Sequence, residues 1–198
     1  MEFAEGFHIE NGVLIRYREG ETCPDTVVIP DTVTTIGEGA FEDCACRRIV
    51  IPGSVLHLQT GAFRGCYDLK EAVLPEGIRV IPDLCFENCT DLKNVVLPET
   101  TEEIGKDVFR YCFTTGVNIR IPKGIRRIGD RAFGSDEPGG SGFDIEEVSL
   151  PLAEEIGEGA FASCSITRLE LAGGLKRIDK AAFRYASLAE VILPEALE

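Results

Sequence analysis

The chain has 198 residues, 44% of them hydrophobic, and a formal net charge of −14 at pH 7. Nucleic acid is not expected as a partner, because phosphate contacts need clustered lysine and arginine. Membrane insertion by this segment is not expected either, since no apolar run approaches the roughly 20 residues of a spanning helix. Residues 1–20 contain no basic start followed by an apolar stretch, so no signal peptide is predicted.

A hairpin is the first predicted element. The stretch FHIENGVLIRY, from Phe7 to Tyr17, places Asn11-Gly12 between two arms of alternating apolar residues. Asn-Gly is the strongest short signal for a two-residue hairpin turn. We therefore predict that residues 1–26 form an N-terminal cap over the rest of the chain.

One sequence unit then recurs every 21 to 29 residues, starting with IPDTVTTIGEGAFEDC. Such a period predicts a solenoid, in which stacked units bury a continuous core. We predict one continuous domain over residues 27–198, with seven repeats and a final strand. The repeat phenylalanines are Phe41, Phe63, Phe86, Phe109, Phe133, Phe161 and Phe183. An aliphatic residue stands five positions earlier, at Ile36, Leu58, Ile81, Ile104, Ile128, Ile156 and Ile178.

Within a repeat the polarity pattern changes twice. The stretch Leu92 to Pro98 alternates apolar and polar residues and then becomes apolar, which predicts a short strand closed by proline. The following segment has apolar residues at Ile104, Val108 and Phe109, close to helical spacing. We predict a turn at Gly105 and then a short helical or 3-10 segment with an acidic first turn.

Two places depart from this regular pattern. Residues 134–144, GSDEPGGSGFD, form an insertion that is predicted to be a surface loop. At the other end, Pro194 to Glu198 follow directly on a predicted strand, without a polar capping unit. Terminal repeats normally need a polar outer face, which favours a fragment of a longer array over a last strand covered by a partner.

The segments VVIPDTVTTIGEGAFEDC and LPLAEEIGEGAFASC resemble the BspA-like leucine-rich repeat family. The resemblance covers residues 7–195. It implies a right-handed α/β solenoid with a parallel sheet on the concave side and short helical or 3-10 turns opposite. It also implies a bacterial origin, a secreted or cell-surface location, and binding of proteins or other cells. Four positions depart from the repeat: Ala172 replaces proline, Asp136 and Ala186 replace cysteine, and Glu154 stands at an apolar site.

Seven of the eight cysteines fit the repeat as small buried side chains. Disulfides between coils, or metal sites, are the alternatives. Side chains in a parallel ladder point the same way, which leaves their Cβ atoms about 5 Å apart and favours free thiols. Cys23 lies outside the ladder and is the one candidate for a reactive thiol. The seven are Cys44, Cys46, Cys66, Cys85, Cys89, Cys112 and Cys164.

No catalytic motif or metal-ligand set is recognisable. His8 and His57 stand at no recognised catalytic spacing from a serine, cysteine or acid, and are interpreted as surface or cap residues. Cys44-x-Cys46 is too short for the usual zinc pair. We predict neither enzymatic activity nor a cofactor or metal.

The strands of the repeat predict an exposed face. Residues one and three before the proline should point inward, and the residue two before should point outward. Four consecutive valines at this outward position, rimmed by polar residues, would form a candidate contact site for a protein. Valine also simply suits a pleated sheet. The candidate residues are Val28, Arg48, Val50, Glu71, Val73, Asn94, Val96, Asn118 and Arg120.

The leading functional hypothesis is non-enzymatic recognition of a protein ligand, of unknown identity, by the exposed sheet. The alternative is a structural spacer within a larger surface protein, with binding elsewhere. Mutation of the valines distinguishes the two, because only a binding face should lose its partner.

Overall fold

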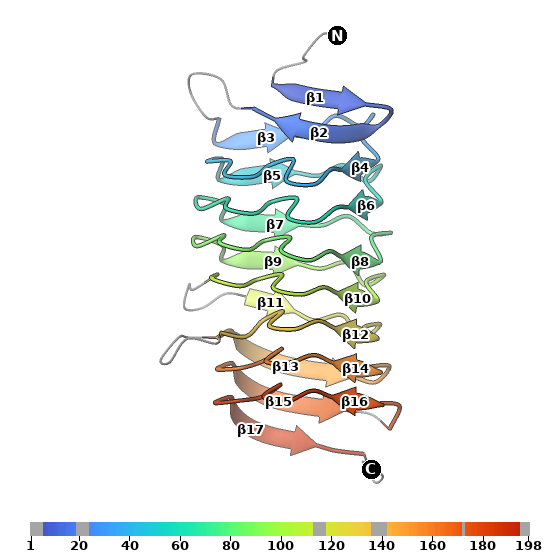
Figure 1. Cartoon of the computed structure of the whole chain (residues 1–198), viewed down its shortest axis with the longest axis vertical. Helices are drawn as coiled ribbons and strands as arrows, with labels where there is room; N and C mark the ends of the chain where they lie inside the picture. Colours follow the sequence, from blue (N-terminus) through green and yellow to red (C-terminus); the bar gives the residue numbers. More distant parts are fainter. Residues whose placement is uncertain (1–5, 19–23, 113–117, 136–141, 172, 195–198) are drawn as a thin grey trace.

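The computed structural model describes residues 6–18, 24–112, 118–135, 142–171 and 173–194. Over these ranges the chain forms a parallel-sheet solenoid of about seven coils, with the N-terminus at one end of the stack and the C-terminus at the other (Figure 1). Each coil contributes one strand to each of two stacks, and neighbouring coils pair in parallel. The predicted solenoid of parallel strands is therefore confirmed.

The first stack carries the longer strands and the second stack carries two-residue strands. The first contains β3 (Thr26–Val28), β5 (Arg48–Val50), β7 (Glu71–Val73), β9 (Asn94–Val96), β11 (Asn118–Arg120), β13 (Asp144–Leu150), β15 (Ser165–Leu171) and β17 (Ser187–Ile192). The second contains β4 (Thr35–Ile36), β6 (His57–Leu58), β8 (Val80–Ile81), β10 (Glu103–Ile104), β12 (Arg127–Ile128), β14 (Glu155–Ile156) and β16 (Arg177–Ile178).

An antiparallel hairpin covers the first coil. It consists of β1 (Phe7–Glu10) and β2 (Val13–Tyr17), joined at Asn11 and Gly12, which both have positive φ angles. This is the backbone that an Asn-Gly turn favours. Strand β2 then pairs in parallel with β4, and the Tyr17 ring lies 5.3 Å from the Phe41 ring, between ring centroids. The hairpin thus shares both a sheet and a core with the repeats.

The repeat phenylalanines form one column through the core. Their ring centroids are 5.2 to 5.5 Å apart in successive coils, and the rings are nearly parallel. The first six rings are at most 2% exposed, as predicted, and the aliphatic residues five positions earlier line the same core. Phe183 and Ile178 belong to the last coil and are partly exposed, because no further coil covers them in the described structure.

The prediction of helical or 3-10 segments is wrong for the described residues, which contain no helix. In the first coil, Gly39 and Asp43 have φ angles of 56° and 60°, so the left-handed region interrupts any helical run. The backbone N–H of Phe41 is donated to the Ala62 carbonyl of the next coil, at 2.9 Å. A backbone N–H that is donated to the next coil is not available for a helical hydrogen bond. The apolar residues at near-helical spacing, such as Ile104, Val108 and Phe109, instead face the core from consecutive turns.

The glycine after the buried aliphatic residue has a different role from the predicted turn. At Gly129, a Cβ atom would lie 2.5 Å from the Gly105 carbonyl carbon of the preceding coil. Neighbouring coils approach too closely there for a side chain, so the glycine is required by packing between coils.

The inserted segment coincides with a break in the first stack. Strands β3 to β11 form one sheet, and β13, β15 and β17 form a separate three-stranded sheet with longer strands.

The repeat after the insertion is one residue shorter than the others between its proline, Pro151, and its isoleucine, Ile156. Ala153 is therefore the buried apolar residue of that coil, whereas Glu154, which the sequence alignment placed at the apolar site, pairs with Arg126 and Lys176 on the surface.

The described cysteines are buried free thiols, and most share one hydrogen-bond pattern. Cys66, Cys89 and Cys112 each donate S–H to the carbonyl of the repeat phenylalanine in the preceding coil, over 3.1 to 3.2 Å. Cys164 does the same over 3.4 Å, and Cys44 contacts the sulfur of Cys46 at 3.2 Å. Cysteine at this position thus combines a small apolar volume with a donor for a buried carbonyl. Cys23 lies outside the described residues.

We expect these thiols to be unreactive in the native protein. Burial raises the pKa of Cys112 and of Cys164 to about 12, so almost no thiolate is present at pH 8. A thiol-specific reagent without reductant should leave the seven buried cysteines unlabelled and should titrate all eight after denaturation. Fewer than eight thiols after denaturation would show that disulfides are present.

Burial of the cysteines also predicts that the stability of the protein depends on pH. Cysteines in an unfolded chain ionise near pH 8.5, well below the pKa of about 12 of Cys112 and Cys164 in the fold. Above about pH 9 the unfolded state therefore binds fewer protons than the native state, and the free energy of unfolding should fall as pH rises towards 12. Replacement of Cys112 by alanine should weaken this alkaline dependence.

Candidate protein-binding surface

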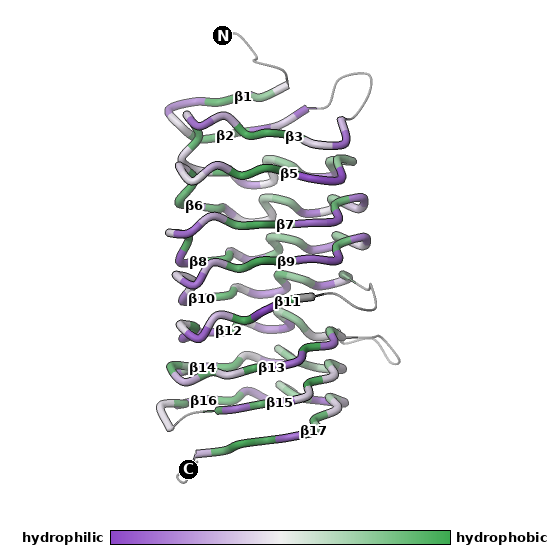
Figure 2. The backbone as a smooth tube through the Cα atoms, turned by 180° about the vertical axis from the view of Figure 1, so that it is seen from behind, coloured by the Kyte–Doolittle hydropathy of each residue, from purple (hydrophilic) through white to green (hydrophobic). Residues whose placement is uncertain are grey.

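Four valines form the candidate site that the alternation of the strands predicts. Val28, Val50, Val73 and Val96 are 61%, 38%, 44% and 44% exposed, and they occupy the same position of β3, β5, β7 and β9. Their inward neighbours Val27, Ile49, Ala72 and Val95 are at most 5% exposed. We call the four residues the valine strip; the hydrophobic parts of these strands lie one above another in Figure 2.

Polar residues line one side of the valine strip and contact one another from coil to coil. The Arg48 guanidinium lies 3.4 Å from a Glu71 carboxylate oxygen, and the Asn94 amide donates to the other Glu71 oxygen at 3.1 Å. Exposed pairs of this kind contribute little stability. Their effect is to fix the orientation of three predicted site residues beside the valines.

After β9, the outward position of the strands is no longer occupied by valine. Arg120 of β11 pairs in register with Val96 and forms an ion pair with Glu99 at 3.3 Å. Asn118 begins the same strand, and its side chain lies outside the described structure. Further along, Ser149 is only 7% exposed and faces Glu170 at 3.3 Å, although alternation placed it outward. The apolar strip therefore spans four coils and ends at a basic residue.

A polar groove of about 680 Å³ continues from Arg120 across the break in the sheet. Its walls carry both signs of charge, and Arg168 on β15 is paired with Glu190 on β17 at 3.0 Å. The charged lining residues are Arg120, Lys123, Asp144, Glu146, Glu147, Arg168 and Glu190. The groove extends the exposed face beyond the valines, with a surface suited to hydrogen bonds and ion pairs.

Two acidic residues beside the strip were not among the predicted site residues. Glu99 pairs with Arg120, and the Glu76 carboxylate accepts the backbone N–H of Glu99 at 3.2 Å. Each stands directly after a repeat proline. This recurrence at one position of the repeat was the signal that could have identified them.

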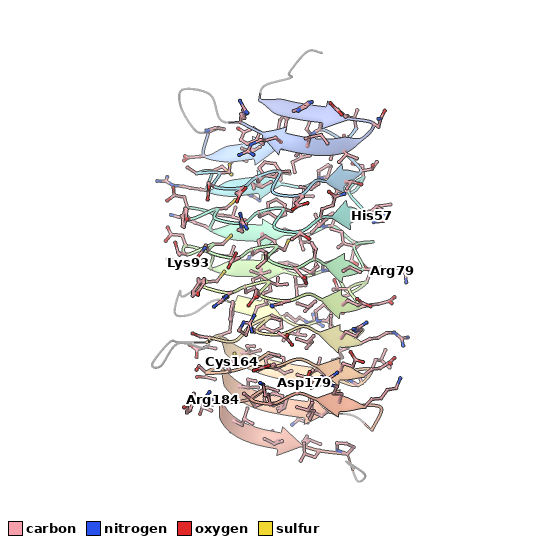
Figure 3. The ribbon with its side chains drawn as sticks, in the orientation of Figure 1. His57, Arg79, Lys93, Cys164, Asp179 and Arg184 are labelled. Carbon is pink, nitrogen blue, oxygen red and sulfur yellow. The ribbon has the colours of Figure 1, made fainter. Side chains whose placement is uncertain are left out.

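Other kinds of site have little basis in the described part of the chain. It contains no group of three or more histidine, cysteine, aspartate or glutamate residues that could hold a metal ion. His8 lies 3.0 Å from Glu10 on the hairpin, and His57 is exposed on β6 (Figure 3). The described part of the chain contains no helix long and apolar enough to cross a membrane.

Comparison with known proteins agrees with the fold. Residues 21–138 and 141–198 match the BspA type leucine-rich repeat region, in six copies. The chain belongs to the BspA-type leucine-rich repeat family. Leucine-rich repeat domains generally mediate protein interactions. No curated protein matches the BspA-type chain significantly.

Solved structures of bacterial leucine-rich repeat proteins are similar to this BspA-type solenoid. A leucine-rich repeat protein from Bacteroides ovatus has 30% identity and a TM-score of 0.75, over 95% of this chain and 51% of that one. The T. pallidum protein TpLRR has 23% identity and a TM-score of 0.58, over 98% and 83%. The pneumococcal vaccine antigen PcpA has 19% identity and a TM-score of 0.54, over 94% and 55%. This chain thus spans about half the length of the Bacteroides ovatus structure.

Proposed function

We propose that the chain is a non-enzymatic protein-recognition module that binds its partner on the valine strip and the polar residues beside it. The observation that carries the proposal is the exposure of 38% to 61% at four valines in consecutive coils of an otherwise strongly charged chain. Clustered apolar side chains with a polar rim are typical of protein contact surfaces. A secreted or cell-surface location, where such a module could meet another cell, is part of the proposal and rests on the family resemblance.

The acidic charge of the chain indicates which kind of partner surface would bind it. The net charge is −14, and Glu76 is among the acids beside the strip, whereas Arg48 and Arg120 are both engaged by carboxylates. Complementary charge speeds association and disfavours wrong partners. A partner whose contact surface combines apolar and basic side chains therefore fits best.

The experiment replaces Val50, Val73 and Val96 by lysine together. Exposed substitutions usually change stability by about 0.5 kcal/mol or less each, so the variant should fold. Loss of the apolar contacts and the added positive charge should weaken binding about tenfold or more. Beads carrying wild-type or variant protein are offered the same extract of cell-surface proteins, and each captured protein is then purified and its Kd for both forms measured.

A matched control adds the same charge elsewhere. Ile15 on β2, Leu56 directly before β6 and Val80 on β8 are 41%, 46% and 48% exposed, and none of them belongs to the first stack. Their triple lysine variant should retain the partners that the strip variant loses. Equal losses in both variants would mean that charge alone matters, and retention by both folded variants would contradict the proposal.

The spacer hypothesis has one structural observation in its favour. The coils form an elongated stack, and ion pairs join neighbouring coils along its length (Figure 1). Such a rod could separate other parts of a longer protein. Unchanged partner binding by the folded strip variant would favour this function.

A further inference from the structure

The outward face of the N-terminal hairpin carries a cavity of about 700 Å³. Phe7 of β1 stands opposite Tyr17 of β2, and both rings are buried. His8 and Arg16 form the next pair along the hairpin, so they point away from the core, as does Arg18 two residues further on. The cavity thus lies on the solvent side of the hairpin, at the N-terminal end of the stack (Figure 1). Its lining residues are Gly6, His8, Ile15, Arg16, Arg18 and Glu38.

Two irregularities of the hairpin shape this cavity. The Gly6 carbonyl accepts the Arg18 N–H at 2.9 Å, and a Cβ atom on Gly6 would lie 2.3 Å from the Arg18 carbonyl oxygen. This position must therefore be glycine, which leaves no side chain opposite Arg18. The pairing register shifts between His8 and Ile9, so Ile15 is an extra residue of β2 without a partner on β1. Such a bulge redirects a side chain, and Ile15 is 41% exposed in the lining of the cavity.

Arg16 and Arg18 have no acidic partner in the part of the chain that the structure describes. Every other arginine except Arg184 lies within 3.9 Å of a carboxylate, and Arg184 lies over the Tyr185 ring. The two arginines that lack both kinds of partner therefore line the same cavity. Uncompensated positive charge in a hollow attracts an anion, even on a chain with a net charge of −14.

The acids near the cavity limit the negative charge that it can accept. Glu10 pairs with His8 at 3.0 Å and is not part of the lining. Glu38 is part of the lining, and it has no basic partner among the described residues. A carboxylate there repels a dianion or a polyanion more strongly than a single negative charge. Since a guanidinium group binds a carboxylate through two parallel hydrogen bonds, a monocarboxylate matches these charges.

We propose that this cavity binds a small organic monocarboxylate with an apolar chain. Arg16 and Arg18 bind the carboxylate, and Ile15 contacts the apolar chain. The volume lies within the roughly 300–1,000 Å³ of small-molecule sites. This binding is independent of protein recognition, because the cavity belongs to the sheet of β1, β2, β4 and β6, whereas the valine strip lies on the sheet of β3 to β11.

Hexanoate is the probe for this site. It is titrated into the full chain, and the backbone amide signals of Ile15, Arg16 and Arg18 are followed by NMR. These signals should shift with a Kd of about 1 mM or lower. Hexanamide has the same apolar chain without the charge, and acetate has the charge without the chain. Each should bind at least about tenfold more weakly than hexanoate.

A double variant tests the two arginines. Arg16→Gln with Arg18→Gln should raise the Kd of hexanoate about tenfold or more, because the amides carry no charge. The matched control, Arg79→Gln with Arg177→Gln, removes the same charge from two exposed arginines that have acidic partners. It should leave the Kd unchanged to within about twofold, and both variants should keep the wild-type Tm within about 2 °C.

Several results would overturn the proposal. Equal Kd values for hexanoate and hexanamide would show that charge has no role, and an unchanged Kd in the folded Arg16→Gln, Arg18→Gln variant would place the acid elsewhere. A Kd above about 10 mM would show that the cavity is not a site. N-acetylglycyl-leucine mimics the C-terminus of a peptide. If it binds about tenfold more tightly than hexanoate, the ligand is a peptide carboxyl end and not a free acid.

Discussion

Phe86→Ala should lower the free energy of unfolding by about 3–5 kcal/mol, because it removes a fully buried ring and leaves a cavity. Phe86 is 0% exposed, and its ring centroid lies 5.2 Å from that of Phe63 and 5.5 Å from that of Phe109. The cavity would interrupt the column in its middle, where packed coils on both sides limit relaxation. Equilibrium chemical unfolding of wild type and variant measures the loss.

Phe183→Ala is the matched control for this prediction. The Phe183 ring stacks on Phe161 at 5.4 Å and belongs to the open last coil, where it is only partly buried. The same truncation should therefore cost less than half as much. A loss below about 1 kcal/mol for Phe86→Ala would contradict the stacked core.

The sequence was sufficient to predict the column of phenylalanines and the exposure of the valines. Both follow from residues that recur at one position of the repeat, so every copy adds support for the same side-chain direction. Phe86 and Val73 are each found where the repeat predicts. The hairpin was equally predictable, because Asn11-Gly12 specifies a turn locally.

The turn segments were not predictable in the same way. The spacing of Ile104, Val108 and Phe109 suits a helix, but the Phe109 N–H is donated to Ala132 of the next coil at 3.0 Å. Hydrogen bonds between coils depend on how the repeats stack, which local spacing does not reveal. The burial of Ser149 was not predictable either, since its hydroxyl contacts Glu170 of the next coil and a single repeat does not reveal such a contact.

The candidate site was likewise predictable only in part. Alternation identified the valine strip, but the pairs beside it, such as Arg48 with Glu71 and Arg120 with Glu99, depend on the registration of neighbouring coils. Acids and bases alternate at one position of the repeat, and this pattern can be read from the sequence once the repeats are aligned on phenylalanine; the residues are Arg79, Glu102, Arg126, Glu154 and Lys176.

Asp107→Gly should lower the free energy of unfolding by about 2–4 kcal/mol, because it breaks a buried ion pair whose loss alone costs about 3–5 kcal/mol. Asp107 is 3% exposed, and its two carboxylate oxygens accept from Nε and Nη2 of Arg131 at 2.7 and 2.9 Å. Asp107 has a φ of 54°, and glycine would relieve about 1 kcal/mol of left-handed strain. Chemical unfolding again provides the measurement.

The double variant Asp107→Gly with Arg131→Gly decides whether the pair itself is responsible. Arg131 has a φ of 50°, and Gly39, Gly61 and Gly159 occupy the same position in other coils, so glycine suits the backbone at both sites. With both charges gone, the part-buried guanidinium of Arg131 is no longer left without this carboxylate, and the double variant should be more stable than Asp107→Gly alone. Additive losses from the two single variants would show that the residues act independently. The ion pair would then not be what joins these coils, and the stability of this part of the stack would rest on the apolar core and on backbone hydrogen bonds such as that from the Phe109 N–H to the Ala132 carbonyl.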